Sequence, residues 1–587
     1  MKALVLNPLA GRSAPCSPRH ADPRPPRREE IVQIDGATKR VLDAGRSRLL
    51  VGAALFALAF VVISGRLFDV TLLQDGVEPR LADGAPSIAP VAERADIVDR
   101  NGVILATSLQ TFSLFANPRE VQDADEAAKE VVNVLPDLSL AEVKAKLEAD
   151  KSFVYLQRNL TPNQQMAISR LGITGLYFQP EEKRAYPLGS LMSHAVGFTD
   201  LDNKGLGGIE QSFDDVLAGG RHPVQLSLDV RIQQIMREEL ARGIQDFNGI
   251  GGAGLVLDAR TSEIMAMVSL PDFEPSQVGS ATPDQRFNRA TLGVYEMGST
   301  FKVFNTAMSL DSGKIKMSDS FDASKPIAIG RFLIHDFEPM HRALTVPEVF
   351  MLSSNIGSAR MAMEVGTDIQ KAFMAKMGMF RPVSLELPEL GKPLYPAEWR
   401  PVNTMTIAFG HGIAVTPMHV VAGVAAMVNG GIMRPLTLIK RSPDEVSDGQ
   451  RVISPDTSKK MRELLRLVVQ AGTGRSAEAP GYLVGGKTGT AEKETGHGYS
   501  KNARLASFVG AFPINDPRYI VLVMVDEPKP NARSYGFATG GWVAAPVVSR
   551  VVQRMAPLLG MEPIPKDAPE AKNELLLQVS AKANAAE

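Results

Sequence analysis

The sequence has a single cysteine, Cys16, in 587 residues. One cysteine excludes an intramolecular disulfide and the paired-cysteine motifs of zinc and redox sites. The eight histidines are scattered, with no HExxH motif and no pair at the i, i+4 spacing of a helix. We therefore expect neither a metal site nor a cofactor.

The sequence also lacks an excess of charge of either sign, since the formal net charge is -1 at pH 7. This balance gives no reason to expect a nucleic-acid partner. The length of 587 residues exceeds the roughly 250 to 300 residues at which a single hydrophobic core stops growing. We therefore expect two folded domains with flanking segments.

Long apolar runs are scarce, and the first of them covers residues 49–63. This run is shorter than the ~20 residues that a membrane-spanning helix needs. Extending it past Gly65 admits Arg66, whose long side chain can reach the headgroups near a helix end. We predict one transmembrane helix over residues 49–70, with a cleavable signal peptide and a buried core helix as the alternatives.

Charge around this helix predicts its orientation. Residues 1–48 contain ten Lys and Arg against five Asp and Glu, whereas acidic residues follow the helix. The positive-inside rule then puts the N-terminus in the cytoplasm and the rest of the chain outside the cell's inner membrane. Because residues 1–48 are rich in Pro and Arg and lack apolar periodicity, we expect a disordered tail there.

The rest of the chain divides at a glycine-rich break at residues 219–223. We expect a non-catalytic α/β pedestal domain over residues 71–222, a second domain over 223–562, and a flexible tail over 563–587. Strand patterns at both ends of the second domain, with helical patterns between them, predict an antiparallel sheet whose terminal strands meet, covered by helices. The fold class is therefore multidomain α+β. The predicted strands of that sheet cover residues 253–257, 263–268, 483–490, 506–512 and 519–525.

A serine and a lysine stand three residues apart at the start of a helical pattern, in Gly298-Ser299-Thr300-Phe301-Lys302. Residues i and i+3 share one face of a helix, so Ser299 would lie beside Lys302. A serine hydroxyl needs an adjacent base to become a nucleophile, and burial can lower the pKa of a lysine enough to provide one. Alone, this SxxK pattern is weak, because a helix-capping serine and a solvated lysine give the same letters.

Two further motifs follow in a fixed order. Ser353-Ser354-Asn355 lies after the SxxK motif, and Lys487-Thr488-Gly489-Thr490 lies on a predicted strand near the end of the chain. SxxK, SxN and KTG in this order are typical of serine acyl-transferases that react with β-lactams. Each motif alone is more often a turn, a cap or a strand end, but all three together are hard to obtain by chance.

With these three motifs in this order, the chain resembles the class B penicillin-binding proteins. The resemblance includes the nucleophile segment at residues 295–302 and three elements before the second domain, at residues 94–102, 184–189 and 205–210. It implies a penicilloyl-serine transferase domain, similar to the serine β-lactamases, behind a pedestal. Within that family, the compact length and the ending of the chain look most like the septal branch, with an elongation role as the alternative.

The resemblance also implies the roles of individual residues. Ser299 is the expected nucleophile, Lys302 its base, and Ser353 with Lys487 the proton shuttle. The residues expected to bind the substrate are Asn355, Thr488, Gly489 and Thr490. Backbone N–H groups of Ser299 and Thr490 would form the oxyanion hole.

The implied function is a D,D-transpeptidase that cross-links peptidoglycan stem peptides and is inhibited by β-lactams. The implied partners are a membrane-embedded, FtsW-like glycan polymerase and other proteins of the division machinery. Three rival functions remain open: a D,D-carboxypeptidase, a β-lactamase, and a sensor that binds β-lactams without turnover. The segment over residues 71–222 is too short for an additional glycosyltransferase domain.

Overall fold

The computed structural model describes residues 50–64, 94–220, 222–330, 332–494, 499–573 and 579. The chain divides into two compact units, Met1–Ala89 and Pro90–Glu587. In the first unit, residues 50–64 form a helix. They lie within the predicted transmembrane helix over 49–70, whose other residues lie outside the described ones, as does the predicted tail over 1–48. Among the described residues, no helix is both long enough and apolar enough to cross a membrane.

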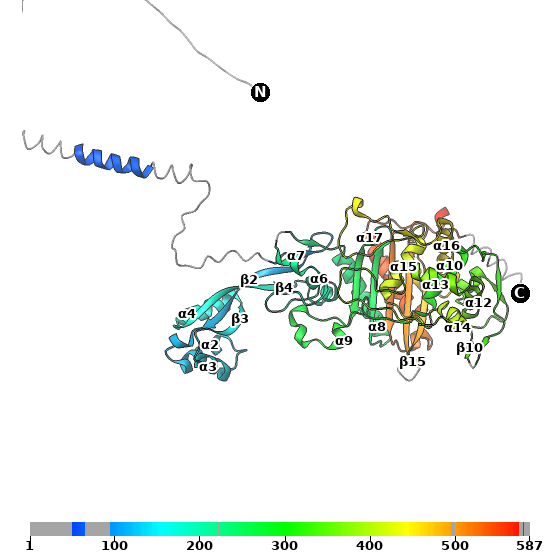
Figure 1. Ribbon diagram of the computed structural model, residues 1–587, viewed down its shortest axis with the longest axis horizontal. Helices are drawn as coiled ribbons and strands as arrows, with labels where there is room; N and C mark the ends of the chain where they lie inside the picture. The colour runs from blue at the N-terminus through cyan, green and yellow to red at the C-terminus, as the bar shows by residue number, and fades with distance from the viewer. Residues whose placement is uncertain are drawn as a thin grey trace, which may run out of the picture. The chain divides into compact units, whose positions relative to one another are not determined.

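A five-stranded antiparallel sheet forms the centre of the second unit (Figure 1). Its strands, in spatial order, are β14 (Gly485–Glu494), β15 (Tyr499–Phe512), β16 (Tyr519–Asp526), β6 (Gly251–Asp258) and β7 (Ile264–Leu270). The late strand β16 pairs with the early strand β6, so that Val523 stands opposite Gly254. The prediction that the terminal strands of this domain meet in one antiparallel sheet is confirmed.

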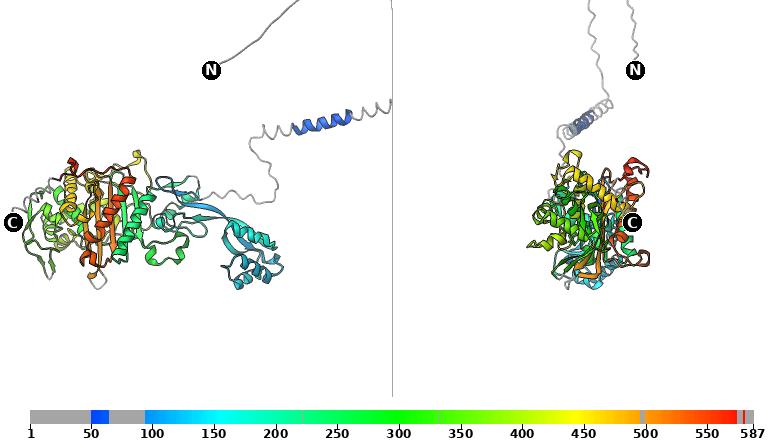
Figure 2. Two further views of the ribbon diagram at one scale, coloured as in Figure 1. Left: turned by 180° about the vertical axis from the view of Figure 1, so that it is seen from behind. Right: turned by 90° about the vertical axis from the view of Figure 1, so that its right-hand side faces the viewer.

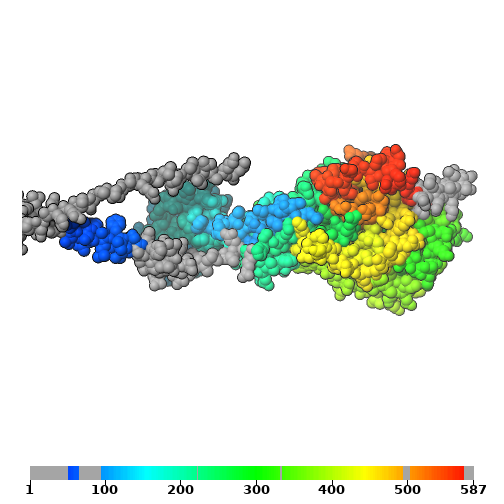
Figure 3. Space-filling model, turned by 90° about the horizontal axis from the view of Figure 1, so that it is seen from above, coloured from blue at the N-terminus to red at the C-terminus, as the bar shows by residue number. Residues whose placement is uncertain are grey.

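Helices cover both faces of this sheet. On one face lie α8 (Val230–Asp246) and α17 (Gly540–Leu558), which pack side by side against the strands (Figure 2). Viewed from above, the red surface of α17 adjoins the orange surface of the last strands (Figure 3). On the other face lie α15 (Pro417–Val428) and α16 (Pro455–Ala471). The sheet therefore separates two hydrophobic cores.

Helices are the main regular elements of the segment between β7 and β14, as predicted, but the segment also contains short strands. The helices besides α15 and α16 are α9 (Pro283–Arg286), α10 (Lys302–Asp311), α11 (Val346–Met351), α12 (Asn355–Val365), α13 (Thr367–Lys376) and α14 (Pro401–Ile407). The strands are β8 (Ser320–Asp322), β9 (Ile327–Ile329), β10 (Phe332–Ile334), β11 (Ala343–Thr345), β12 (Ile432–Met433) and β13 (Gln450–Arg451). Strands of two or three residues are too short to show a period-2 pattern, which is why the sequence did not reveal them.

The pedestal is built on a second sheet, whose longest strand is β2 (Ile104–Ala116). The other strands of this sheet are β1 (Ile97–Val98), β3 (Val154–Leu160), β4 (Leu176–Ala185) and β5 (Val224–Gln225). Three helices, α2 (Ala124–Val134), α3 (Leu140–Leu147) and α4 (Pro162–Leu171), pack against it over their own small core. The shorter helices of the pedestal are α5 (Ser193–Val196), α6 (Gly208–Ser212) and α7 (Asp214–Ala218).

A buried ion triad joins the three sequence elements singled out in the pedestal. Glu210 of α6 accepts from Arg94 at 2.7 Å and from Arg184 of β4 at 2.6 Å. Its side chain is fully buried, and both arginine side chains are at least 95% buried. Arg94 also pairs with Asp214 at 2.7 Å. One carboxylate therefore fixes the segment before β1, strand β4 and helix α6, which lie far apart in the sequence.

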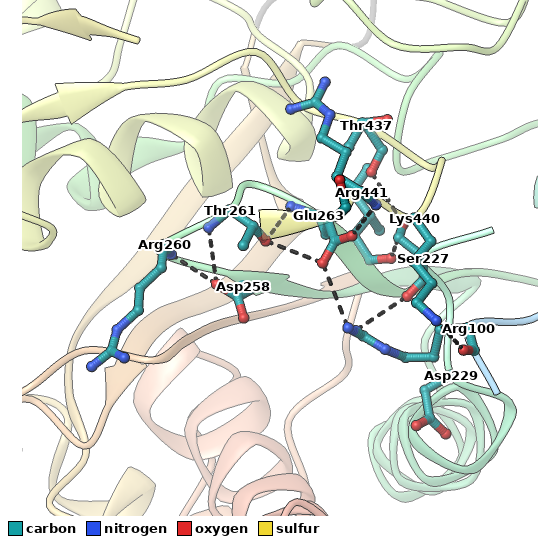
Figure 4. A network of polar contacts seen from close by, with 12 residues as sticks. Arg100, Ser227, Asp229, Asp258, Arg260, Thr261, Glu263, Thr437, Lys440 and Arg441 are labelled. Atoms are coloured by element: carbon teal, nitrogen blue, oxygen red, sulfur yellow. Dashed lines mark hydrogen bonds and ion pairs between the residues drawn. The ribbon is translucent and has the colours of Figure 1, made fainter. Parts of the chain in front are cut away.

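A second polar network joins the pedestal to the domain of the five-stranded sheet (Figure 4). Glu263, in the turn between β6 and β7, lies 3.5 Å from Arg100 of the pedestal and accepts from the backbone N–H of Arg441 at 2.7 Å. Lys440 donates to the backbone carbonyl of Arg100 at 3.1 Å. These contacts join the pedestal to the β7 side of the sheet, whereas β14 forms its opposite edge.

We predict that Glu210→Ala strongly destabilises the protein, because it leaves the buried guanidinium of Arg184 without a carboxylate and that of Arg94 with Asp214 alone. Breaking a buried ion pair typically lowers the free energy of unfolding by about 3 to 5 kcal/mol. Thermal unfolding of the variant and of the wild type measures the effect.

The matched control is Asp150→Ala. Asp150 pairs with Arg119 at 3.0 Å, with the two side chains 92% and 63% exposed. Such pairs contribute about 1 kcal/mol or less. Equal melting temperatures for the two variants would show that the triad is not a stabilising element.

Candidate active site

Ser299 lies at the start of the helix that carries Lys302. A short 3-10 turn, η5 (Gly298–Phe301), leads directly into α10. The Nζ atom of Lys302 lies 2.8 Å from the Oγ atom of Ser299. Ser299 is partly exposed, whereas Lys302 is completely buried. An accessible hydroxyl therefore faces an amine that is shielded from water.

Ser353 stands on the other side of the Lys302 amine, at the junction of α11 and α12. Its backbone has φ of 61°, in the left-handed region that non-glycine residues rarely adopt. This conformation turns both its carbonyl oxygen and its Oγ atom toward Lys302, at 2.7 and 3.1 Å from Nζ. The strain at Ser353 thus places two oxygens of one residue beside the amine.

Lys487 reaches the same serine from the sheet. It lies on β14, is completely buried, and donates from Nζ to the Oγ atom of Ser353 at 2.9 Å. Ser299, Lys302, Ser353 and Lys487 therefore form one continuous chain of polar contacts, although they come from three separate segments of the sequence.

The contacts of Lys302 indicate where its protons point. Its Nζ atom lies 2.7 Å from the carbonyl oxygen of Ser353 and 2.7 Å from the Oδ1 atom of Asn355. These two oxygens can only accept, so they take two N–H groups of the amine. If Lys302 is neutral, its lone pair is left for the third close neighbour, the hydroxyl of Ser299. This arrangement suits the removal of a proton from Ser299.

Burial favours the neutral form of both lysines. Desolvation, followed by the positive charge of Lys487, lowers the pKa of Lys302 well below the ordinary lysine value, against the opposing effect of Asp336. Desolvation alone lowers the pKa of Lys487 to about 7. Two buried amines that share one hydroxyl repel each other when both are charged, so the proximity of Lys487 adds to the effect of burial on Lys302.

Asn355 is held in place by the segment that follows β10. Its side-chain amide donates one N–H to the carbonyl oxygen of His335 at 3.0 Å. Asp336 accepts from the backbone N–H groups of Asn355 and Ile356 at 2.6 and 3.0 Å, and from the hydroxyl of Ser354 at 2.7 Å. An amide nitrogen carries two hydrogens, so Asn355 retains one N–H for a ligand.

Thr488 and Thr490 follow Lys487 on the edge strand and share one face of it. The Oγ1 atoms of Thr488 and Thr473 lie 2.8 Å apart. The Oγ1 atom of Thr490 accepts from the backbone N–H of Gly540, at the start of α17, at 3.1 Å. The N-terminus of this long helix adds positive potential beside the two hydroxyls, which favours an anionic group there.

Two glycines allow the nucleophile segment to approach β14. Gly298 has φ of +54°, and a Cβ atom on it would lie 2.5 Å from the carbonyl oxygen of Thr490. A Cβ atom on Gly489 would lie 2.8 Å from the carbonyl oxygen of Met297. The family resemblance placed Gly489 among the residues expected to bind the substrate. The structure shows that it also leaves room for the chain's own nucleophile segment.

All eight residues selected from the sequence therefore lie in one region, but sequence reasoning missed Asp336 and Thr473. Asp336 lies in a loop after a three-residue strand, and Thr473 lies in the turn after α16. Neither belongs to a motif with a recognisable spacing. A single aspartate or threonine in a loop carries no signal until the fold brings it to the site.

A partly exposed serine, a buried lysine with a lowered pKa and a second lysine on an edge strand are typical of serine acyl-transferases in which a lysine activates the nucleophile. The comparisons with known proteins give the family. The model of the penicillin-binding protein transpeptidase domain matches residues 252–553, and that of the penicillin-binding protein dimerisation domain matches residues 89–245. The chain belongs to the class B penicillin-binding proteins.

Individual relatives agree with this assignment. The chain is 39% identical over 575 residues to the probable peptidoglycan D,D-transpeptidase FtsI of Caulobacter vibrioides, covering 95% of each chain. It is 28% identical to the peptidoglycan D,D-transpeptidase FtsI of Escherichia coli, covering 88% of this chain and 92% of the other. The crystal structure of penicillin-binding protein 3 of Mycobacterium tuberculosis, complexed with aztreonam, matches with a TM-score of 0.64 and 26% identity, covering 81% of this chain and 98% of that one.

We predict that the amine of Lys487 titrates with a pKa of about 7, whereas an ordinary lysine titrates near about 10.4. The measurement is an NMR titration of the lysine side chains, with Lys487→Arg used to assign the signal. Because desolvation lowers the pKa of this base, the ammonium form appears as the pH falls through about 7. A signal that remains protonated up to pH of about 10 would show that water reaches this amine.

Proposed function

We propose that this protein is a peptidoglycan D,D-transpeptidase that works through an acyl-enzyme on Ser299. The observation that carries the proposal is the chain of contacts from Ser299 through Lys302 and Ser353 to Lys487. The chain gives the nucleophile a base and gives the released proton a path to a leaving group. The names of the relatives, which are D,D-transpeptidases, support the same activity.

The acylation step begins when the Oγ atom of Ser299 attacks the carbonyl carbon of the penultimate D-Ala of a stem peptide. Lys302, 2.8 Å away, accepts the hydroxyl proton. The negative charge that develops on the carbonyl oxygen is stabilised by the backbone N–H groups of Ser299 and Thr490. The close approach of Gly298 to Thr490 supports this pairing. An oxyanion hole of this kind lowers the barrier by about 3 to 4 kcal/mol per donor.

Collapse of the tetrahedral intermediate breaks the peptide bond to the terminal D-Ala. The departing amine takes a proton through the hydroxyl of Ser353, which contacts Lys302 at 3.1 Å and Lys487 at 2.9 Å. The acyl group remains on Ser299 as an ester. The amine of a second stem peptide then attacks this ester and gives a proton to Lys302. As the cross-link forms, the bond between the acyl carbon and the Oγ atom of Ser299 breaks, and Lys302 returns the proton to that oxygen.

Substrate orientation depends on two further contacts. Thr488 and Thr490 donate their hydroxyl protons to the terminal carboxylate, next to the N-terminus of α17. Asn355 donates its remaining N–H to a carbonyl of the stem peptide. A β-lactam carries a carboxylate and a strained amide at comparable positions, so it acylates Ser299 in place of the peptide.

We further propose that the catalytic domain is held outside the inner membrane by a single transmembrane helix over residues 49–70. The helix observed over residues 50–64 and the basic residues before it support this anchor. We propose the domain boundaries 71–222 and 223–562 for the pedestal and the transpeptidase domain, with β5 (Val224–Gln225) crossing this boundary to pair with β1. We also propose a disordered tail over 1–48 and a flexible tail over 563–587. The backbone N–H of Ile564 donates to the carbonyl oxygen of Gly481 at 2.7 Å, so the start of the second tail contacts the domain.

We place this activity at the division septum, because the relatives at 39% and 28% identity are named FtsI. The natural partners would then be an FtsW-like glycan polymerase within the membrane and other proteins of the division machinery. The pedestal and the anchor helix would hold the transpeptidase beside the polymerase.

We predict that Ser299→Ala abolishes covalent labelling by fluorescent penicillin and leaves the fold intact, because a serine at a helix start contributes only about 1 kcal/mol to stability. Gel fluorescence and peptide mapping of the labelled serine measure the outcome. Labelling that persists in this variant would remove Ser299 as the nucleophile.

The companion variant is Lys302→Arg, which keeps the positive charge but cannot accept a proton, because guanidinium stays protonated in proteins. We expect labelling to fall nearly as far as in Lys302→Ala. Labelling at the wild-type rate would mean that Lys302 acts only as a positive charge.

The septal assignment is tested by depletion of the protein in its host. We predict filaments that grow but fail to divide, measured by microscopy of cells stained for new cell wall. Round or swollen cells that still form septa would contradict the septal role and favour the elongation branch, with the same chemistry at Ser299.

A further inference from the structure

The hydroxyls of Thr488 and Thr490 face a simple constraint if they bind a carboxylate. A carboxylate only accepts hydrogen bonds, and a threonine hydroxyl has one proton to give. Each hydroxyl must therefore turn its proton toward the ligand. A threonine hydroxyl is held in this orientation when a second donor forms a hydrogen bond to a lone pair of its oxygen.

For Thr490 that donor is visible, since the backbone N–H of Gly540 can only donate and points at the Oγ1 atom from 3.1 Å. For Thr488 the nearest partner is the hydroxyl of Thr473, at 2.8 Å between the Oγ1 atoms, where either oxygen can be the donor. The amine of Lys487 lies 3.5 Å from the Oγ1 atom of Thr488. That distance is at the outer limit of a hydrogen bond, so Lys487 is a weak competitor.

The loop that carries Thr473 is held from two sides. The backbone N–H groups of Gly472 and Gly474 both donate to the carbonyl oxygen of Val468 in α16, at 3.0 and 3.1 Å. A Cβ atom on Gly541, at the start of α17, would lie 2.6 Å from the carbonyl oxygen of Thr473. The backbone of Thr473 is therefore fixed, while its side chain is exposed next to the buried Thr488.

We propose that Thr473 is a positioning residue for the transpeptidase: its hydroxyl donates to Thr488, and this contact directs the Thr488 proton toward the terminal carboxylate of the substrate or the carboxylate of a β-lactam. The inference rests on the proposed function, in which Thr488 and Thr490 bind that carboxylate. Each of the two hydroxyls then accepts one hydrogen bond from the protein. Thr490 accepts from the backbone N–H of Gly540, and Thr488 accepts from the hydroxyl of Thr473.

The test compares two ligands that differ only in the carboxylate, benzylpenicillin and its methyl ester, on the full-length protein. Thr473→Val replaces the hydroxyl with a methyl group of similar size, and Thr473→Ser keeps the hydroxyl. We expect Thr473→Val to lower the second-order rate constant of acylation about tenfold for benzylpenicillin and less than about twofold for the ester, since a hydrogen bond to a charged group is lost only in the first case. Thr473→Ser should stay within about twofold of the wild type for both ligands.

A second comparison separates positioning from direct contact with the ligand. In a Thr488→Val background, Thr473→Val should have no further effect on benzylpenicillin acylation, because the hydroxyl through which Thr473 acts is gone. A further loss in that background would mean that Thr473 binds the ligand itself, and it would overturn the proposal. Ser476→Ala, an exposed hydroxyl in the same loop region, is the control and should match the wild type.

Equal losses for benzylpenicillin and its ester in Thr473→Val would also overturn the proposal, because they would indicate a general disturbance of the loop. So would unchanged acylation of benzylpenicillin. Failure of the proposed function looks different, since wild-type protein would then not be labelled at Ser299 by either ligand. Under the present inference, Thr473→Val is still labelled at Ser299, only more slowly.

Discussion

The burial of two lysine amines around one serine hydroxyl is the constraint on which the rest of the site depends. An amine removed from water loses its preference for the charged form, and a second amine close by lowers that preference further. Among the residues that the structure describes, no carboxylate contacts Lys302, and Asp336 accepts instead from backbone N–H groups at the start of α12. The neutral base is thus a product of packing, because helices and a sheet edge exclude water from both lysines.

In the pedestal, by contrast, the buried positive charges are paired with a carboxylate. Arg94 and Arg184 are as deeply buried as the two lysines, but both share the carboxylate of Glu210. Guanidinium stays protonated in proteins, so these residues can be buried only with a counter-charge. The same chain therefore pairs its buried cations where it needs fixed geometry. It leaves its buried amines without a contacting carboxylate where a proton must move.

The sequence predicted those parts of the protein that depend on local pattern. Four of the five strands of the catalytic sheet contain apolar runs, whereas β14 carries the KTG motif. The pairing of β16 with β6 agrees with the strand patterns at both ends of the domain. The motifs around Ser299, Ser353 and Lys487 have fixed internal spacing.

The remaining features of the structure are long-range contacts between residues that belong to no motif, and these could not be predicted from the sequence. The triad at Glu210 joins three segments that the sequence marked, yet nothing in their pattern indicated that they touch. Asp336 and Thr473 are loop residues outside any motif. Only the folded structure shows that Asp336 contacts the backbone of Asn355 and that Thr473 contacts the hydroxyl of Thr488.

The orientation of the N–H and O–H groups in the site follows from neighbouring atoms that can only donate or can only accept a hydrogen bond. The carbonyl oxygen of Ser353 and the Oδ1 atom of Asn355 can only accept, so they orient the N–H groups of Lys302 and leave its lone pair for Ser299. The backbone N–H of Gly540 can only donate, so it turns the Thr490 proton outward. The hydroxyl of Ser353 lies between the amines of Lys302 and Lys487 and can both donate and accept, so it is the position where a proton can change direction. Fixed donors and acceptors around this reversible hydroxyl therefore give this site both a defined ground state and a route for proton transfer.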